Sequence, residues 1–150
     1  MPEVDYPEFR HVGLVVRDIE RCVAFYQELG FEVLVDNQDS APLISDLLGL
    51  DVRSLRVVKL GRPPEATCVE LLGFDPVIDS SRPPLNGTGI THFALTVENV
   101  DTFYEAHRHR GSFLSEPRVS LDGRFKLVFC RDPEGNVIEV VSAKPHPSSI

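Results

Sequence analysis

The chain has 150 residues, of which 42% are hydrophobic and 25% charged, a composition typical of a folded globular domain and not of a disordered chain. Its 23 acidic residues outnumber 15 Lys and Arg, and the net charge of -8 argues against a nucleic-acid or anionic-membrane partner. No apolar run approaches the roughly 20 residues that span a bilayer. The N-terminus also lacks the apolar region of a signal peptide, so we expect a cytoplasmic protein.

The first half of the chain predicts a strand, a helix and three further strands. Asp18 is a suitable helix cap, and Gly30 is placed to end the same helix. The expected elements are a strand at 9–16, a helix at 18–29, a strand at 31–36, a helical turn or two within 37–53, and strands at 55–60 and 67–72.

The second half repeats this order after a segment at 74–88 that is rich in proline and serine. Its expected elements are a strand at 89–97, a helix at 100–110, a strand at 112–119 broken by Pro117, and strands at 124–130 and 136–141. Each half therefore follows the pattern β-α-β-β-β, and the fold class is α+β. We expect one domain built from two modules, with bounds of about 9–73 and 89–142, a linker at 74–88 and a tail at 143–150.

Two histidines and two glutamates occupy matching places in this repeat. HVGLVVRDIE, which starts at His11, aligns with HFALTVENVD, which starts at His92. CVELL around Glu70 likewise matches VIEVV around Glu139. If the halves pair about a pseudo-twofold axis, the four side chains meet at one point. Two imidazoles and two carboxylates that converge are typical of a divalent metal site.

Each of these residues also has a plainer interpretation. A single histidine on an apolar strand is most often a hydrogen-bonded core residue. The glutamates have as their alternative a salt bridge to a nearby base, such as Lys59 or Lys126. The equivalence of His11 with His92, together with the matching glutamates, favours the metal site over these alternatives. The three cysteines lack CxxC spacing and are expected to be small buried apolar residues.

Four segments resemble the vicinal oxygen chelate superfamily: HVGLVVRDIERCVAFYQELGFEVL, VELLGF, GITHFALTVENVD and FCRDPEGNVIEVV. The superfamily includes glyoxalase I, methylmalonyl-CoA epimerase, extradiol dioxygenases, fosfomycin-modifying enzymes and bleomycin-binding proteins, and the resemblance covers roughly residues 9–142. It implies that the two modules form a cup-shaped half-barrel of mixed sheet around one divalent ion, usually in a homodimer. Whether one chain or both chains of a dimer supply the ligands is left open, because both arrangements occur in the superfamily.

Within the superfamily, the set His11, Glu70, His92 and Glu139 is most similar to the metal ligands of glyoxalase-like lyases. The resemblance implies a divalent ion, Ni, Zn, Co, Mn or Mg, or Fe(II) if the protein is a dioxygenase. One segment departs from the glyoxalase I pattern, since ELLGFDPV lacks the asparagine that follows the first glutamate and helps to hold glutathione. That departure puts a glutathione adduct in doubt and leaves the metal chemistry untouched.

The expected function is a metal-dependent lyase or isomerase that removes a proton next to a carbonyl of a small molecule chelated through two neighbouring oxygens. Glu139 is the expected base, and Glu70 its counterpart for proton return. An anionic tail of the substrate is expected at Arg124, Lys126 and Arg131, whose alternative role is to keep a strand edge hydrated. The alternatives are an extradiol-type dioxygenase and a non-catalytic binding protein of the bleomycin type.

Overall fold

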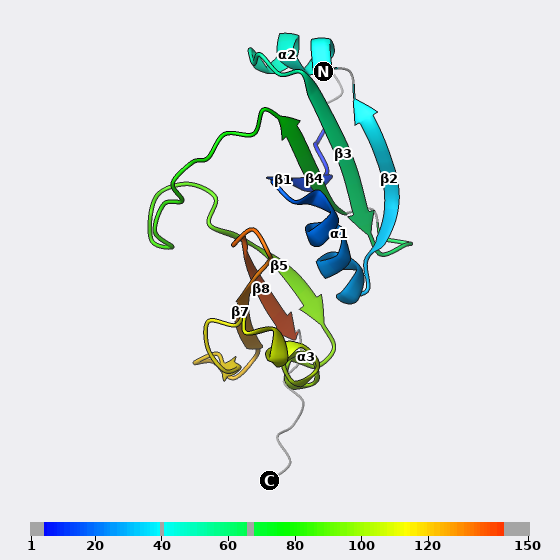
Figure 1. Cartoon of the computed structure of the whole chain (residues 1–150). Coiled ribbons are helices and arrows are strands. Elements are labelled where there is room, and N and C mark those ends of the chain that lie inside the picture. The colour runs from blue at the N-terminus through cyan, green and yellow to red at the C-terminus, as the bar shows by residue number, and fades with distance from the viewer. Residues whose placement is uncertain (1–4, 40, 66–67, 143–150) are drawn as a thin grey trace. The chain divides into compact units, whose positions relative to one another are not determined.

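The computed structural model describes residues 5–39, 41–65 and 68–142, with the expected tail at 143–150 lying outside this part of the chain. It divides into two compact units, Met1–Asp79 and Ser80–Ile150. Each unit is built on its own four-stranded sheet and is described by itself (Figure 1). Among the described residues, no helix combines the length and the apolar character that crossing a bilayer requires.

Within its described residues, the first unit has four strands and two helices. In chain order these are β1 (His11–Val15), α1 (Ile19–Glu28), β2 (Glu32–Asp39), α2 (Ala41–Leu48), β3 (Ser54–Gly61) and β4 (Cys68–Asp75). The strands lie in the order β1-β4-β3-β2, with β1 parallel to β4 and the other pairs antiparallel. The sheet is therefore mixed, and the first and last strands of the unit are neighbours.

The second unit repeats the same topology with a shorter edge strand. Its elements are β5 (His92–Val97), α3 (Val100–His107), the 3-10 turn η1 (Arg108–Arg110), β6 (Arg118–Val119), β7 (Lys126–Arg131) and β8 (Val137–Ser142). The strand order is β5-β8-β7-β6, again with one parallel pair, β5 and β8. The prediction of an α+β fold built from two β-α-β-β-β modules with mixed sheet is thus confirmed.

Capping residues set the ends of the long helices. Asp18 caps α1 by accepting a hydrogen bond from the Arg21 backbone N–H at 3.1 Å, and Asn99 caps α3 by accepting one from Thr102 at 3.0 Å. Gly30, with φ of 94°, follows the end of α1 in the left-handed region that glycine tolerates best. The two halves therefore start their helices by the same device.

The structure differs from the expected elements at several strand ends, since β2 continues to Asp39 and β5 starts only at His92, and one expected strand is largely lost. The strand expected at 112–119 is reduced to Arg118–Val119 and one isolated bridge between Phe113 and Cys130. Pro117 lies between these two contacts and has no N–H to donate to a ladder, which explains the interruption. Strand β4 continues to Asp75, so the ladder extends two residues into the expected linker.

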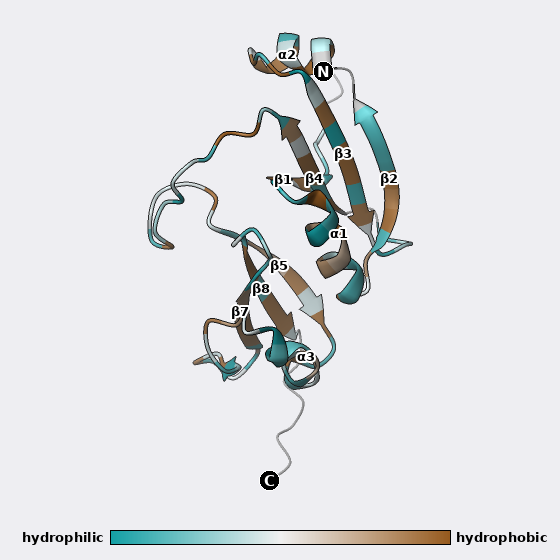
Figure 2. Cartoon of the chain, viewed as in Figure 1, coloured by the Kyte–Doolittle hydropathy of each residue, from teal (hydrophilic) through white to brown (hydrophobic). Residues whose placement is uncertain are grey.

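The helices cover one face of each sheet, and the opposite face also carries buried apolar side chains, among them Leu55, Val57 and Val137. Helix α1 contacts β2, β3 and β4, while α3 contacts β7 and β8. On the helix side the side chains are fully or almost fully buried, as at Val58, Leu60, Leu71, Val128, Ile138 and Val140. Long stretches of these strands are hydrophobic (Figure 2). Because side chains alternate along a strand, Glu70 and Glu139 lie on the face opposite the helices.

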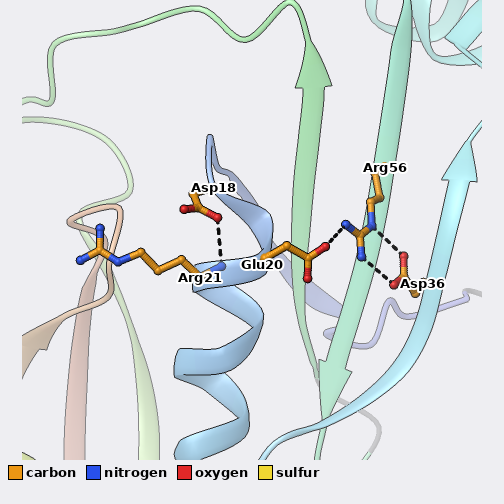
Figure 3. A network of polar contacts seen from close by, with 5 residues as sticks. All are labelled: Asp18, Glu20, Arg21, Asp36 and Arg56. Atoms are coloured by element: carbon orange, nitrogen blue, oxygen red, sulfur yellow. Dashed lines mark hydrogen bonds and ion pairs between the residues drawn. The ribbon is translucent and has the colours of Figure 1, made fainter.

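Arg56 ties α1 to the sheet of the first unit. Its guanidinium donates two hydrogen bonds to Asp36 of β2, at 2.9 and 2.8 Å, and a further one to Glu20 of α1 (Figure 3). Two-point contacts between a guanidinium and a carboxylate fix both position and angle. These bonds raise the pKa of Arg56 above its ordinary value and hold the pKa of Asp36 below its ordinary value.

Asp132 organises the turn between β7 and β8. Its side chain is buried and accepts hydrogen bonds from the backbone N–H groups of Glu134 and Asn136, each at 2.9 Å, and from the Asn136 amide at 2.7 Å. Arg82 closes the turn from outside by donating to Asn136 Oδ1 at 2.7 Å and to the Glu134 carbonyl at 2.5 Å. The turn therefore holds Glu139, three residues beyond Asn136, at a fixed register.

The expectation of buried cysteines is met at the two positions where the side chain is described. Cys22 and Cys130 are almost fully buried. Burial, with a smaller contribution from the charge of Asp132, raises the pKa of the Cys130 thiol to about 11. A thiol of that kind is a packing residue and a poor nucleophile. The side chain of Cys68 lies outside the described part of the chain.

Candidate metal centre

The first candidate pair lies in the sheet of the first unit. His11 opens β1, and the parallel ladder places Gly13 of that strand beside Glu70 of β4. His11 and Gly13 share a face by alternation, so His11 reaches Glu70 diagonally across the ladder. His11 Nε2 lies 3.5 Å from Glu70 Oε1, and the two side chains are 27% and 14% exposed. This contact is half-buried and still reachable from solvent.

The second pair repeats this arrangement in the second unit. Ala94 of β5 lies beside Glu139 of β8, and His92 shares the face of Ala94. His92 Nε2 lies 3.2 Å from Glu139 Oε2, with side-chain exposures of 39% and 23%. The same ring nitrogen therefore faces a carboxylate oxygen in both halves.

The spacing within each pair fits two ligands of one metal ion. Ligand atoms that are each about 2.1 Å from an ion lie about 3.0 Å apart at an octahedral right angle and about 3.4 Å apart at a tetrahedral angle. The observed separations are 3.2 Å in the second unit and 3.5 Å in the first. Nitrogen and oxygen donors of this kind suit divalent ions such as Zn, Ni, Co and Mn. The residues present therefore fit a divalent ion.

The four expected ligands fall into these two pairs, one in each unit. Within the described ranges, no cluster of three or more His, Cys, Asp or Glu side chains is close enough together to hold an ion. Each unit by itself thus supplies half of the expected ligand set. The binding of one ion by all four side chains stays a prediction.

The two glutamates have different neighbours on the adjoining strand. Lys59 of β3 is paired with Glu70 in the ladder, and its Nζ lies 3.5 Å from Glu70 Oε2. The corresponding partner of Glu139 is Phe129 of β7. The ring of Phe129 packs edge-on against His92, with centroids 5.4 Å apart. The salt bridge considered as an alternative role for Glu70 is therefore present, beside the contact with His11.

The two histidines also differ at their second ring nitrogen. The hydroxyl of Thr91 is 2.9 Å from His92 Nδ1, a contact that fixes the orientation of the ring. His11 Nδ1 is buried and has no hydrogen-bond partner among the described residues. An unsatisfied buried ring nitrogen is costly, and His11 has its contact with Glu70 at the other ring nitrogen. The second pair is the better oriented of the two.

The three basic residues expected at the substrate have distinct surroundings. Lys126 forms an ion pair with Asp101 of α3, which places its ammonium on the helix side of the sheet. Arg124 is largely exposed, with Nε 3.9 Å from an Asp122 carboxylate oxygen. Arg131 lies on the face opposite Lys126, which is the face of Glu139, because side chains alternate along β7. It donates a hydrogen bond to the Gly135 carbonyl at 3.0 Å. A role of Arg124, Lys126 and Arg131 in substrate binding stays a prediction.

The comparison with known families settles the relationship that these pairs suggest. Residues 8–140 match the family model described as the Glyoxalase/Bleomycin resistance protein/Dioxygenase superfamily. The chain belongs to this superfamily. The match spans both units and all four residues of the two His–Glu pairs.

Known proteins similar to this superfamily member include enzymes and solved structures. A lactoylglutathione lyase from Arabidopsis thaliana is 26% identical over 157 residues, covering 97% of this chain and 48% of the plant protein. The chain thus spans about half the length of the curated relatives it matches. A glyoxalase family protein from Bacillus cereus is 21% identical with a TM-score of 0.83, covering 95% of this chain and 97% of that one. A superfamily member from Sphaerobacter thermophilus is 27% identical with a TM-score of 0.64, over 91% and 98% of the two chains.

Two residues beside the pairs were not found by sequence reasoning as parts of the site. Thr91 directly precedes His92 and carries a signal of its own, since a hydroxyl next to a candidate ligand is a suitable orienting group. The sequence gives no sign that Phe129 belongs to the site, because an aromatic residue in a strand is usually interpreted as a core residue. The ladder register is what pairs Phe129 with Glu139 and Lys59 with Glu70.

Proposed function

We propose that this chain is a metal-dependent lyase or isomerase of the glyoxalase type, acting on a small molecule that presents two neighbouring oxygens. The observation that carries the proposal is the repeated His–Glu pair, with the same ring nitrogen facing a carboxylate at 3.5 Å in one unit and 3.2 Å in the other. Membership of the superfamily and the lyase named among its relatives support this reaction class.

In the proposed site, His11, Glu70, His92 and Glu139 together hold one divalent ion, within one chain or between two copies. When bound, the ion would act as a Lewis acid that lowers the cost of negative charge on the substrate oxygens. With four protein ligands, such an ion would still be able to take the two neighbouring oxygens of the substrate. The support for a shared ion is the repeat itself, because neither pair alone supplies enough ligands to hold one tightly.

The contacts of the two glutamates support different roles in proton transfer. Both oxygens of Glu70 have a partner, His11 at one and Lys59 at the other. Glu139 lies within ion-pair distance of His92 alone among the described residues, and Phe129 lies beside it. Glu139 is therefore the freer of the two to turn toward a C–H bond of the substrate. We assign it the role of base, with Glu70 returning the proton.

Metal analysis of the purified protein tests the proposal. We expect about one divalent ion per chain in the wild type and a large loss of affinity in His11→Ala and in His92→Ala, measured by titrating the apo protein with Ni, Zn, Mn and Fe(II). A preference for Fe(II) with oxygen consumption in the presence of a catechol would favour a dioxygenase instead. Absence of metal binding under all these conditions would leave a binding protein without catalysis, and the proposal would fail.

A further inference from the structure

The two half-sites carry different net charges because Lys59 and Phe129 occupy the same ladder position. Each lies directly opposite the glutamate of its unit on the neighbouring antiparallel strand. Lys59 is one of the two side chains within ion-pair distance of Glu70, while Phe129 contributes a ring against His92. If only each His–Glu pair and its ladder neighbour are counted, with neutral imidazoles as metal coordination requires, the first half-site is uncharged and the second carries one negative charge.

The ammonium of Lys59 is placed to act inside the site. Its side chain is 28% exposed and shares the face of Glu70, opposite the helices. Arg56, three residues earlier on the same strand, alternates to the other face and is bound by Asp36 and Glu20. Strand β3 therefore carries two basic residues on opposite faces. Arg56 lies on the helix side, where two carboxylates compensate its charge, and Lys59 lies on the side of the candidate ligands.

A charge count over the proposed site gives the kind of ligand it prefers. A divalent ion neutralises Glu70 and Glu139, so the ammonium of Lys59 leaves one positive charge in excess. A half-buried excess charge is costly unless a ligand of opposite sign compensates it. Building on the proposed function, we propose that the site takes a ligand with one negative charge at its chelating end, of the 2-hydroxycarboxylate or 2-oxocarboxylate class, and that Lys59 binds the carboxylate.

Such a ligand matches the groups present. One oxygen next to the carboxylate and one carboxylate oxygen would serve as the neighbouring pair for chelation, and the second carboxylate oxygen would accept a hydrogen bond from Lys59. An ammonium–carboxylate hydrogen bond is stronger than a neutral one, so a neutral ligand of the same shape would lose both this bond and the charge compensation. The preference is therefore for the anion and not merely for the pair of oxygens.

Isothermal titration calorimetry on the protein loaded with the ion identified by metal analysis tests this assignment. Glycolate and hydroxyacetone are the probes, since they share a hydroxyl next to a carbonyl carbon and differ in charge. We expect glycolate to bind more tightly than hydroxyacetone to the wild type. Lys59→Met should weaken glycolate binding about tenfold or more and leave hydroxyacetone unchanged. Lys59→Arg should restore most of the glycolate affinity.

Arg53→Met is the matched control, because it removes one positive charge outside the site, where Arg53 pairs with Asp75. This variant should bind glycolate as the wild type does. If Lys59→Met takes up the ion and binds glycolate with unchanged affinity, Lys59 only holds Glu70 and the inference is wrong while the proposed function stands. If the wild type takes up no ion at all, the proposed function and the inference both fail.

Discussion

Arg56 and Lys126 occupy the same place in the two units: each reaches from the strand next to the glutamate-bearing strand to an acid in the first turn of the helix. Arg56 of β3 pairs with Glu20 of α1, and Lys126 of β7 pairs with Asp101 of α3. Both acids are the second residue of their helix, where negative charge also interacts favourably with the helix dipole. The repeat therefore includes the bridge between helix and sheet as well as the candidate metal ligands.

Arg56→Met should lower the free energy of unfolding by about 1 kcal/mol, the upper end of the range for exposed ion pairs, because Arg56 serves two carboxylates at once. Chemical denaturation with a constant m-value checks this change. Arg53→Met is the comparison, since Arg53 binds one carboxylate and is itself far more exposed. An equal loss in the two variants would contradict the importance given to the bridge with α1.

Asp36 should make the stability of the first unit depend on pH in the acid range. The hydrogen bond from Arg56 holds the pKa of Asp36 below its ordinary value, so its stabilisation is fully present above about pH 4, the unfolded value. It is lost as the pH falls through the lowered pKa. The difference in melting temperature between wild type and Asp36→Asn should be constant from pH 6 to 8 and shrink below about pH 4. A difference that grows on acidification would show that the sign is wrong.

Asp132→Ala should destabilise the second unit by about 2 kcal/mol, since it leaves part-buried N–H groups of the β7–β8 turn without the carboxylate acceptor. Hydrogen exchange at Glu134 and Asn136 should become faster in the same variant. Asp132→Asn retains one oxygen acceptor and should lose less. Unchanged exchange at both amides in Asp132→Ala would mean that the turn is held by Arg82 instead.

Glu139→Gln should reduce turnover by about 100-fold or more while the protein remains folded, because an amide cannot accept the proton. Exchange of the substrate C–H hydrogen for deuterium, followed by NMR, measures the step directly and does not require knowledge of the product. The substitution Glu70→Gln should weaken ion binding more than Glu139→Gln does, since Glu70 is the carboxylate held in place on both oxygens. Full exchange activity in Glu139→Gln would remove it from the role of base.

The helices, most strands and the mixed α+β class were predictable because they depend on local signals. The caps Asp18 and Asn99 and the alternation around Glu70 and Glu139 are each readable within a few residues. The edge strand at 112–119 was overestimated, since its apolar residues suggest a ladder that Pro117 interrupts.

The candidate site was predictable only as a list of residues that share a repeat. The pairing of His11 with Glu70 and of His92 with Glu139 within separate sheets depends on a parallel ladder between distant segments. The sequence does not show that Lys59 and Phe129 occupy the same ladder position. The turns that follow the two residues differ in length, so an alignment of the halves on their glutamates places them one position apart. Strand register, which depends on the whole sheet, was the missing information.

The parallel contact between the first and last strands of each unit has an evolutionary consequence. Because of this contact, the histidine and the glutamate of each pair belong to one continuous stretch of sequence. Duplication of a single ancestral gene segment would therefore copy a complete pair together with its helix and capping residue. Later substitutions at one copy, such as lysine at 59 against phenylalanine at 129, then alter one pair without touching the geometry of the other. Descendants of such a duplication can therefore change one His–Glu pair while the other stays as it was.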